Sequence, residues 1–177
     1  MYKQHYASKI HFPEIVIKDY DFESFCKKYS SFDMVPKMKS IIDMLNLSFK
    51  HYLVNVTIKD YSVGDKTCVD TRYHVDGDYT KDNVYCLWCK GSNRTVFSKS
   101  SLENVSMPNE RMAQNIFLEN LLKDSNSYEV DDQTIYRYTS KDPHKGVICK
   151  VPGNRIFVRV MGTNYLTPKN YIQRKHG

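Results

Sequence analysis

The tripeptide His74-Val75-Asp76, followed directly by Gly77, contains two side chains that can bind a metal ion. On an extended strand, residues i and i+2 point to the same face, so the imidazole and the carboxylate would lie side by side. Together they could fill two adjacent coordination positions of a borderline metal such as Fe(II). Six histidines and twenty acidic residues supply roughly 0.7 His-x-Asp/Glu tripeptides by chance, so the motif alone also fits a plain turn.

A metal site of this kind needs a third ligand from a distant part of the chain, and His144 is the best-placed candidate. It begins an expected strand, which a turn connects to a second strand. The other histidines are less well placed, because His5, His11 and His51 precede the motif and His176 lies in the basic C-terminal sequence QRKHG.

Two arginines follow His144 at positions that suit the binding of a carboxylate. Arg155 lies eleven residues after His144, and Arg159 follows four residues later. On a strand both would project from one face, whereas the even-numbered residues between and beside them are apolar. A guanidinium can hold a carboxylate through two parallel hydrogen bonds. An exposed strand face with solvated arginines is the alternative interpretation.

Taken together, these residues resemble the signature of the Fe(II)- and 2-oxoglutarate-dependent dioxygenases. The shared pattern is His-x-Asp, a distal histidine, and an arginine eleven residues after that histidine. The spacing is most similar to the taurine dioxygenase and phytanoyl-CoA hydroxylase branches, and less similar to the nucleic-acid demethylase branch. The segment PHKGV…GNRIFVRV is also similar to the distal segment of those two branches, and the resemblance covers roughly residues 68–161.

The resemblance implies a catalytic metal centre. His74, Asp76 and His144 would bind Fe(II) from one side as a facial triad, which leaves three coordination positions open. The cosubstrate 2-oxoglutarate would take two of them and O2 the third. The protein would then oxidise a C–H bond of a substrate that the sequence does not identify.

The resemblance also implies roles for the polar residues around that centre. Arg155, assisted by Thr95 in the segment GSNRTVF, would hold the far carboxylate of 2-oxoglutarate. Arg159 would share in cosubstrate binding or meet an anionic substrate. Arg72, two residues before His74 and therefore on the same strand face, is a weaker candidate on the substrate side.

The elements that must position these residues indicate an α+β fold. Apolar residues at helical spacing predict helices over 21–29, 35–46 and 108–123, the last opened by Pro108 with an apolar stripe of Met112, Ile116, Phe117 and Leu121. A period of two predicts strands over 12–20, 51–61, 68–75, 83–90, 94–98, 127–132, 134–140, 146–151 and 155–162, with a tight turn at 152–154.

This arrangement predicts a single domain with a small antiparallel barrel or sandwich. We expect a helical N-terminal support over 1–50, a core over 51–161 with one inserted helix, and a basic tail over 162–177. The resemblance makes the core a double-stranded β-helix, or jelly roll, with helices packed outside one sheet.

Composition indicates a soluble protein of a reducing compartment. The chain has 177 residues, 41% hydrophobic and 26% charged, and no apolar run of membrane-spanning length or signal-peptide character. Its five cysteines have no disulfide-framework spacing. We therefore expect a cytoplasmic protein. The abundance of Tyr, Lys, Asn and Asp suggests an AT-rich, viral genome, in which case the cytoplasm is that of the host cell.

Two other function classes remain open at this point. A net charge of +6 and fourteen tyrosines also suit a non-catalytic, β-rich viral protein that binds nucleic acid or a host partner. A barrel with different metal chemistry, such as a cupin-type isomerase, is a further alternative. A zinc knuckle at Cys86-x-x-Cys89 is disfavoured, because residues three apart on a strand point to opposite faces.

Overall fold

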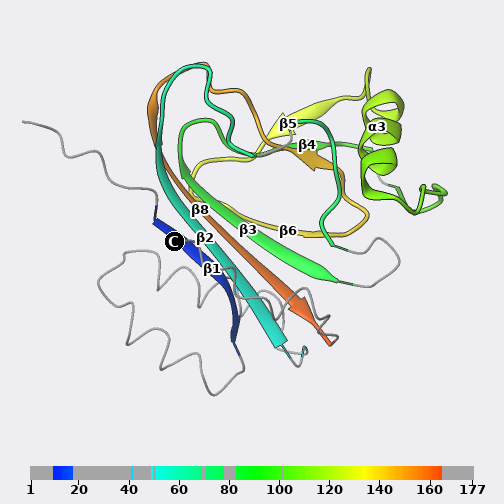
Figure 1. The fold of residues 1–177 in the computed structure, drawn as a ribbon, viewed down its shortest axis with the longest axis horizontal. Coiled ribbons are helices and arrows are strands. Elements are labelled where there is room, and N and C mark those ends of the chain that lie inside the picture. The colour runs from blue at the N-terminus through cyan, green and yellow to red at the C-terminus, as the bar shows by residue number, and fades with distance from the viewer. Residues whose placement is uncertain are drawn as a thin grey trace, which may run out of the picture.

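Two antiparallel sheets dominate the structure of the protein. The structure is a computed structural model, and it describes residues 10–17, 41, 49, 51–68, 71–77, 83–100 and 102–164. Figure 1 shows the long strands of the larger sheet side by side, and α3 beside the smaller sheet. The larger sheet has the order β1 (Ile10–Ile17), β2 (His51–Tyr61), β8 (Gly153–Thr163), β3 (Val84–Gly91) and β6 (Ile135–Thr139). The smaller sheet has the order β5 (Ser127–Glu129), β4 (Val96–Ser98) and β7 (His144–Lys145), and the helix is α3 (Arg111–Leu121).

The larger sheet is buried on both faces around β8, which pairs with β2 on one side and β3 on the other. On one face, apolar even-numbered residues such as Trp88, Val158 and Val160 are 0–3% exposed. On the other face, which meets the smaller sheet, one hydrophobic cluster joins both sheets; its buried members are Tyr85, Leu87, Cys89, Phe97, Val130 and Tyr138. The odd-numbered arginines of β8 share this second face, as the alternation along the sequence predicted.

Most expected strands are present with small differences in length. The strand expected over 51–61 is β2, and the segments 83–90, 94–98 and 134–140 contain or overlap β3, β4 and β6. The structure is therefore mostly β-sheet, with antiparallel pairing throughout the named strands.

Two expected strands are wrong. Within 71–77 only His74 pairs, in an isolated bridge to His144, and the segment is otherwise irregular. After β7, residues 146–151 form no strand, because their backbone bonds instead hold the loop 62–68: Thr67 N–H donates to the Val147 carbonyl and Cys149 N–H to the Asp65 carbonyl. The turn expected at 152–154 is consequently not a hairpin turn, since Gly153 already belongs to β8.

The helix α3 is shorter than expected and buries a different face. Glu110, rather than Pro108, caps it by accepting hydrogen bonds from two backbone N–H groups of the first turn. Met112, Ile116 and Leu121 of the expected apolar stripe are 48–61% exposed. Another set of helical residues faces inward, and Leu118 and Leu122 pack with Tyr73, Val75 and Leu102 next to the His-x-Asp segment.

The helices expected over 21–29 and 35–46 lie outside the described residues, except Ile41, which is helical and fully buried. Most of the expected basic tail also lies outside them, while Gly162 and Thr163 belong to β8. Among the described residues, no helix is long and apolar enough to cross a membrane.

Gly91 allows β3 and β8 to meet beside Arg155, with which it pairs in register. Its φ is +102°, and a Cβ there would overlap the Asn154 carbonyl oxygen. Gly64 has a similar φ of +89° but open space around it. We expect Gly91→Ala to destabilise the protein by about 3 kcal/mol or more, and Gly64→Ala only by the backbone strain of about 1–2 kcal/mol. Urea unfolding of both variants measures their free energies of unfolding. An equal loss of stability in the two variants would contradict the close approach of Gly91 to the Asn154 carbonyl oxygen.

Candidate metal centre

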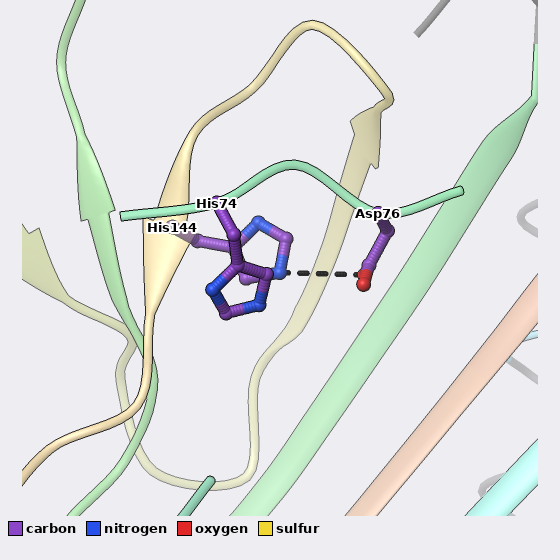
Figure 2. Close-up of side chains that lie close together, drawn as sticks. All are labelled: His74, Asp76 and His144. Atoms are coloured by element: carbon purple, nitrogen blue, oxygen red, sulfur yellow. Dashed lines mark ion pairs between the residues drawn. The ribbon is translucent and has the colours of Figure 1, made fainter. Parts of the chain in front are cut away.

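His74, Asp76 and His144 converge at one buried point between the two sheets. Their ligand atoms all lie within 4.8 Å of one another, and the residues are 6–9% exposed. Figure 2 shows the two imidazoles side by side, with Asp76 across from His144. The bridge between His74 and His144, two backbone hydrogen bonds of 2.9 Å, places the ring centroids 4.6 Å apart. Among the residues that the structure describes, this is the one group of three able to hold a metal ion.

Both histidines are oriented with Nε2 toward the centre of this group. His74 Nδ1 lies 3.1 Å from the Arg72 carbonyl oxygen, and His144 Nδ1 lies 3.1 Å from the Asp142 carbonyl oxygen. A carbonyl can only accept, so each Nδ1 carries the proton and donates it. In neutral rings this leaves the Nε2 lone pairs as ligands, which is how metal-binding histidines are usually fixed.

Asp76 is held on both of its oxygens. The Tyr138 hydroxyl donates to Oδ2 at 2.6 Å, and Arg159 Nη1 donates to Oδ1 at 2.7 Å. Burial by itself would raise the pKa of Asp76, but Arg159, His144 and Tyr138 together hold that pKa well below its usual value. Burial and the nearby Asp76 carboxylate raise the Tyr138 pKa well above 10, so its hydroxyl remains a donor. Asp76 is therefore an oriented carboxylate that stays ionised.

The residues present fit a metal ion at this point. His144 Nε2 and Asp76 Oδ2 are 3.3 Å apart. In a neutral His144 with the proton on Nδ1, both of these atoms are acceptors, so their approach requires a shared cation. That cation is either a second proton on the imidazole or a metal ion. Two imidazole nitrogens and one carboxylate on one side match the ligand preference of Fe(II).

His74 should make the stability of the metal-free protein depend on pH. Burial, and next the neighbouring His144, lowers the His74 pKa from 6.5 to about 4. In the unfolded chain His74 takes up a proton near pH 6.5, whereas in the folded protein it stays neutral down to about pH 4. The free energy of unfolding therefore has its full value above pH 6.5 and decreases as the pH falls toward 4. We expect wild type to lose about 2 kcal/mol from this source between pH 7 and pH 5. Urea unfolding in the presence of a chelator measures the free energy of unfolding at each pH. This free energy should depend less on pH in His74→Gln than in wild type, and an equal pH dependence in both proteins would contradict the prediction.

Arg155 is a buried cation without an acidic partner among the described residues. It is 4% exposed, its Nη2 donates to Thr95 Oγ1 at 3.1 Å, and Nη1 lies 3.5 Å from the Thr67 carbonyl. Its guanidinium lies 4.9 Å from the Phe157 ring centroid, and its buried Nε has no hydrogen-bond partner. Burying an unpaired guanidinium is costly, so this side chain is a site prepared for an anion.

One cavity of about 520 Å³ contains both groups. All the residues expected at the site line it except Arg72, whose backbone carbonyl orients His74. Arg159 lines the cavity, and its Nη1 donates a hydrogen bond to Asp76. Tyr138 and the polar residues of β2 were not expected at the site. Strand periodicity shows which of these side chains share a face, but their closeness to the metal ligands depends on which strands pair.

Cys86 and Cys89 belong to no group of three metal ligands among the residues that the structure describes. Both are buried, and Cys89 belongs to the hydrophobic cluster on the cavity face, whereas Cys86 does not. Burial raises the Cys86 pKa to about 11, so its thiol remains protonated. This agrees with the packing role favoured by the strand periodicity.

Comparison with solved structures finds a similar fold in the protein EvdO2. Two crystal structures of EvdO2 from Micromonospora carbonacea var. aurantiaca, one of them complexed with 2-oxoglutarate, match with a TM-score of 0.51. The identity is 11%, and the match covers 90% of this chain and 73% of EvdO2. The likeness is one of fold. No protein-family model and no curated protein matches the sequence.

Proposed function

We propose that this chain is an Fe(II)- and 2-oxoglutarate-dependent dioxygenase that oxidises a C–H bond of a substrate. The observation that carries the proposal is a single cavity that holds two features: a buried His-Asp-His group, and the buried Arg155 of β8, which has no acidic partner among the described residues. A dianionic cosubstrate can bind the metal at one end and place its other carboxylate on the buried arginine. The 2-oxoglutarate complex of the structurally similar EvdO2 supports the same cosubstrate.

His74, Asp76 and His144 would hold the metal through two Nε2 atoms and one carboxylate oxygen. A bound Fe(II), with O2 and 2-oxoglutarate, supplies the oxidising power for the reaction. The chain itself contributes orientation: two backbone carbonyls fix the imidazoles, and Tyr138 and Arg159 fix the carboxylate. We therefore reassign Arg159 from a cosubstrate or substrate contact to a positioning residue of Asp76.

Arg155 and Thr95 would bind the far carboxylate of 2-oxoglutarate. The free Nε and the Nη groups of Arg155 provide a donor fork for a carboxylate, and the Thr95 hydroxyl lies beside it at 3.1 Å. Phe157, which packs against the guanidinium, provides an apolar surface between the two ends of the cavity. Such a lining suits the methylene groups of the cosubstrate and keeps water from the carboxylate.

The arrangement of strands supports a double-stranded β-helix, or jelly roll, for the core. From β2 onward, counting the segment with His74, the chain crosses between the sheets at each step except from β4 to β5. The strands β2, β3, β6 and β8 belong to the larger sheet, while β4, β5 and β7 belong to the smaller one. The segment with His74 bridges to β7 and so extends the smaller sheet. Successive segments that alternate between two antiparallel sheets are the pattern of this fold.

Anaerobic titration of the purified metal-free protein with Fe(II) and then 2-oxoglutarate tests the proposal. We expect a weak visible charge-transfer band when both are bound, absent in His74→Ala. His176→Ala, a histidine outside the described residues, is the matched control and should keep the band. A well-folded wild-type protein without the band would overturn the enzyme proposal and favour the non-catalytic binding protein.

A further inference from the structure

Strand β2 forms a polar wall of the cavity. In its regular register with β8, Asn55 lies opposite Arg159 and Lys59 lies opposite Arg155, with Thr57 between them opposite Phe157. Residues directly opposite each other on an antiparallel pair project from the same face. All of them line the cavity, so β2 presents an amide, a hydroxyl and an ammonium along one side of it.

The proposed reaction leaves this wall without a role. The metal would engage the three triad residues, Arg155 the cosubstrate, and Arg159 is bonded to Asp76. Beyond β8 the same face of the sheet is more apolar, because β3 and β6 contribute Leu87 and Tyr138 there. A ligand that lies across this face therefore has a polar or charged side and a hydrocarbon side.

Two lysines give the polar wall a positive charge. Lys59 Nζ lies 3.8 Å from Asp65 Oδ2, and the side chains of both residues are more than a third exposed. A pair of this kind contributes under about 1 kcal/mol, so an incoming anion can compete for the ammonium. The Tyr61 ring, 4.6 Å from Lys59 Nζ, keeps the ammonium at the wall.

Lys66 lies at the rim of the cavity in a loop that is held in place. It forms an isolated bridge to Ile148, and on either side of it the loop bonds to residues 147 and 149 through three backbone hydrogen bonds of 2.8–3.0 Å. Lys66 lines the cavity and is exposed. Two lysines on ordered backbone thus face the same opening.

We propose that this polar wall, Asn55, Thr57 and Lys59 with Lys66 at the rim, binds the carboxylate or phosphate group of a small organic substrate. The inference rests on the proposed function, since Arg155 must be occupied by the cosubstrate for the lysines to serve a second anion. The cavity of about 520 Å³ must also hold the cosubstrate, and the space that remains suits a small organic molecule. Its hydrocarbon part would lie against Leu87 and Phe157, toward the metal centre.

Calorimetric titration of the protein loaded with Mn(II) and 2-oxoglutarate tests the wall, with methyl phosphate and butyrate as probes at constant ionic strength. We expect one probe to bind to wild type and to bind at least tenfold more weakly to Lys59→Gln/Lys66→Gln, with 2-oxoglutarate affinity unchanged within about twofold. Lys90→Gln/Lys99→Gln, two exposed lysines that do not line the cavity, is the matched control and should bind the probe as wild type does.

Three results would overturn the inference. The first is that neither probe binds to wild type, or that the Lys59→Gln/Lys66→Gln variant binds the probe as tightly as wild type does. The second is that the double variant loses affinity for 2-oxoglutarate instead, which would make the wall part of the cosubstrate site. The third is tight binding of a single-stranded oligonucleotide that depends on the same lysines. Failure of the proposed function is distinct, because wild type would then not bind 2-oxoglutarate at all.

Discussion

Asp76→Asn should weaken Fe(II) binding by about 100-fold or more. Loss of a residue that only orients a ligand typically costs 10–100-fold in metal affinity, so loss of the charged ligand itself should cost at least as much. The amide keeps the size of the carboxylate and can still accept from Tyr138, so the change removes charge with little change in packing. Anaerobic calorimetric titration with Fe(II) measures the loss.

The same variant should also destabilise the metal-free protein, by about 1–2 kcal/mol. Arg159 then loses its charged partner at 2.7 Å, and the loss is moderate because the Arg159 side chain is 28% exposed and water can replace the bond. Glu129→Gln is the control, since it breaks a looser pair with Arg94, 3.8 Å apart, on the surface. It should change stability by less than about 0.5 kcal/mol and leave Fe(II) affinity intact. Wild-type Fe(II) affinity in Asp76→Asn would contradict the assignment of the triad.

The three candidate ligands could be predicted from spacing, but the reason for their convergence could not. We expected His74 and Asp76 on a regular strand, whereas only His74 pairs, in an isolated bridge. Their approach to His144 comes from one bridge and from Tyr138 and Arg159, which hold Asp76. Each of these contacts joins residues far apart in sequence, and local periodicity carries no information about them.

Strand periodicity predicts which residues share a face, and that part of the site follows from the sequence. It placed Arg155 and Arg159 together on β8, away from the apolar even-numbered residues. It could not predict that Lys59 lies opposite Arg155, because register depends on which strands become neighbours. The face of α3 was partly mispredicted for a similar reason: Leu118, and Phe117 of the expected stripe, pack against the cluster beside the His-x-Asp segment. The other stripe residues are exposed: Met112, Ile116 and Leu121.

Arg155→Met should weaken 2-oxoglutarate binding by about 30-fold or more without destabilising the ligand-free protein. Truncating one partner of a buried, hydrogen-bonded charge pair costs about 2–5 kcal/mol, so affinity should fall roughly 30-fold to several thousand-fold. In the ligand-free protein the guanidinium is buried without an acidic partner among the described residues. Methionine fills a similar volume without that desolvation cost, so the free energy of unfolding should stay level or rise.

Urea unfolding in the presence of Mn(II), with and without 2-oxoglutarate, measures both effects. Wild type should gain about 2.7 kcal/mol at a ligand concentration 100 times its Kd, and Arg155→Met should gain less than about 1 kcal/mol at the same concentration. Arg155→Lys keeps the charge but not the planar fork, and should retain a reduced gain. Arg137→Met, on an exposed position of β6, is the control and should gain as wild type does. A full gain in Arg155→Met would mean that another group holds the cosubstrate. A marked loss of ligand-free stability would mean that this arginine is structural, and that its burial needs no anion to explain it.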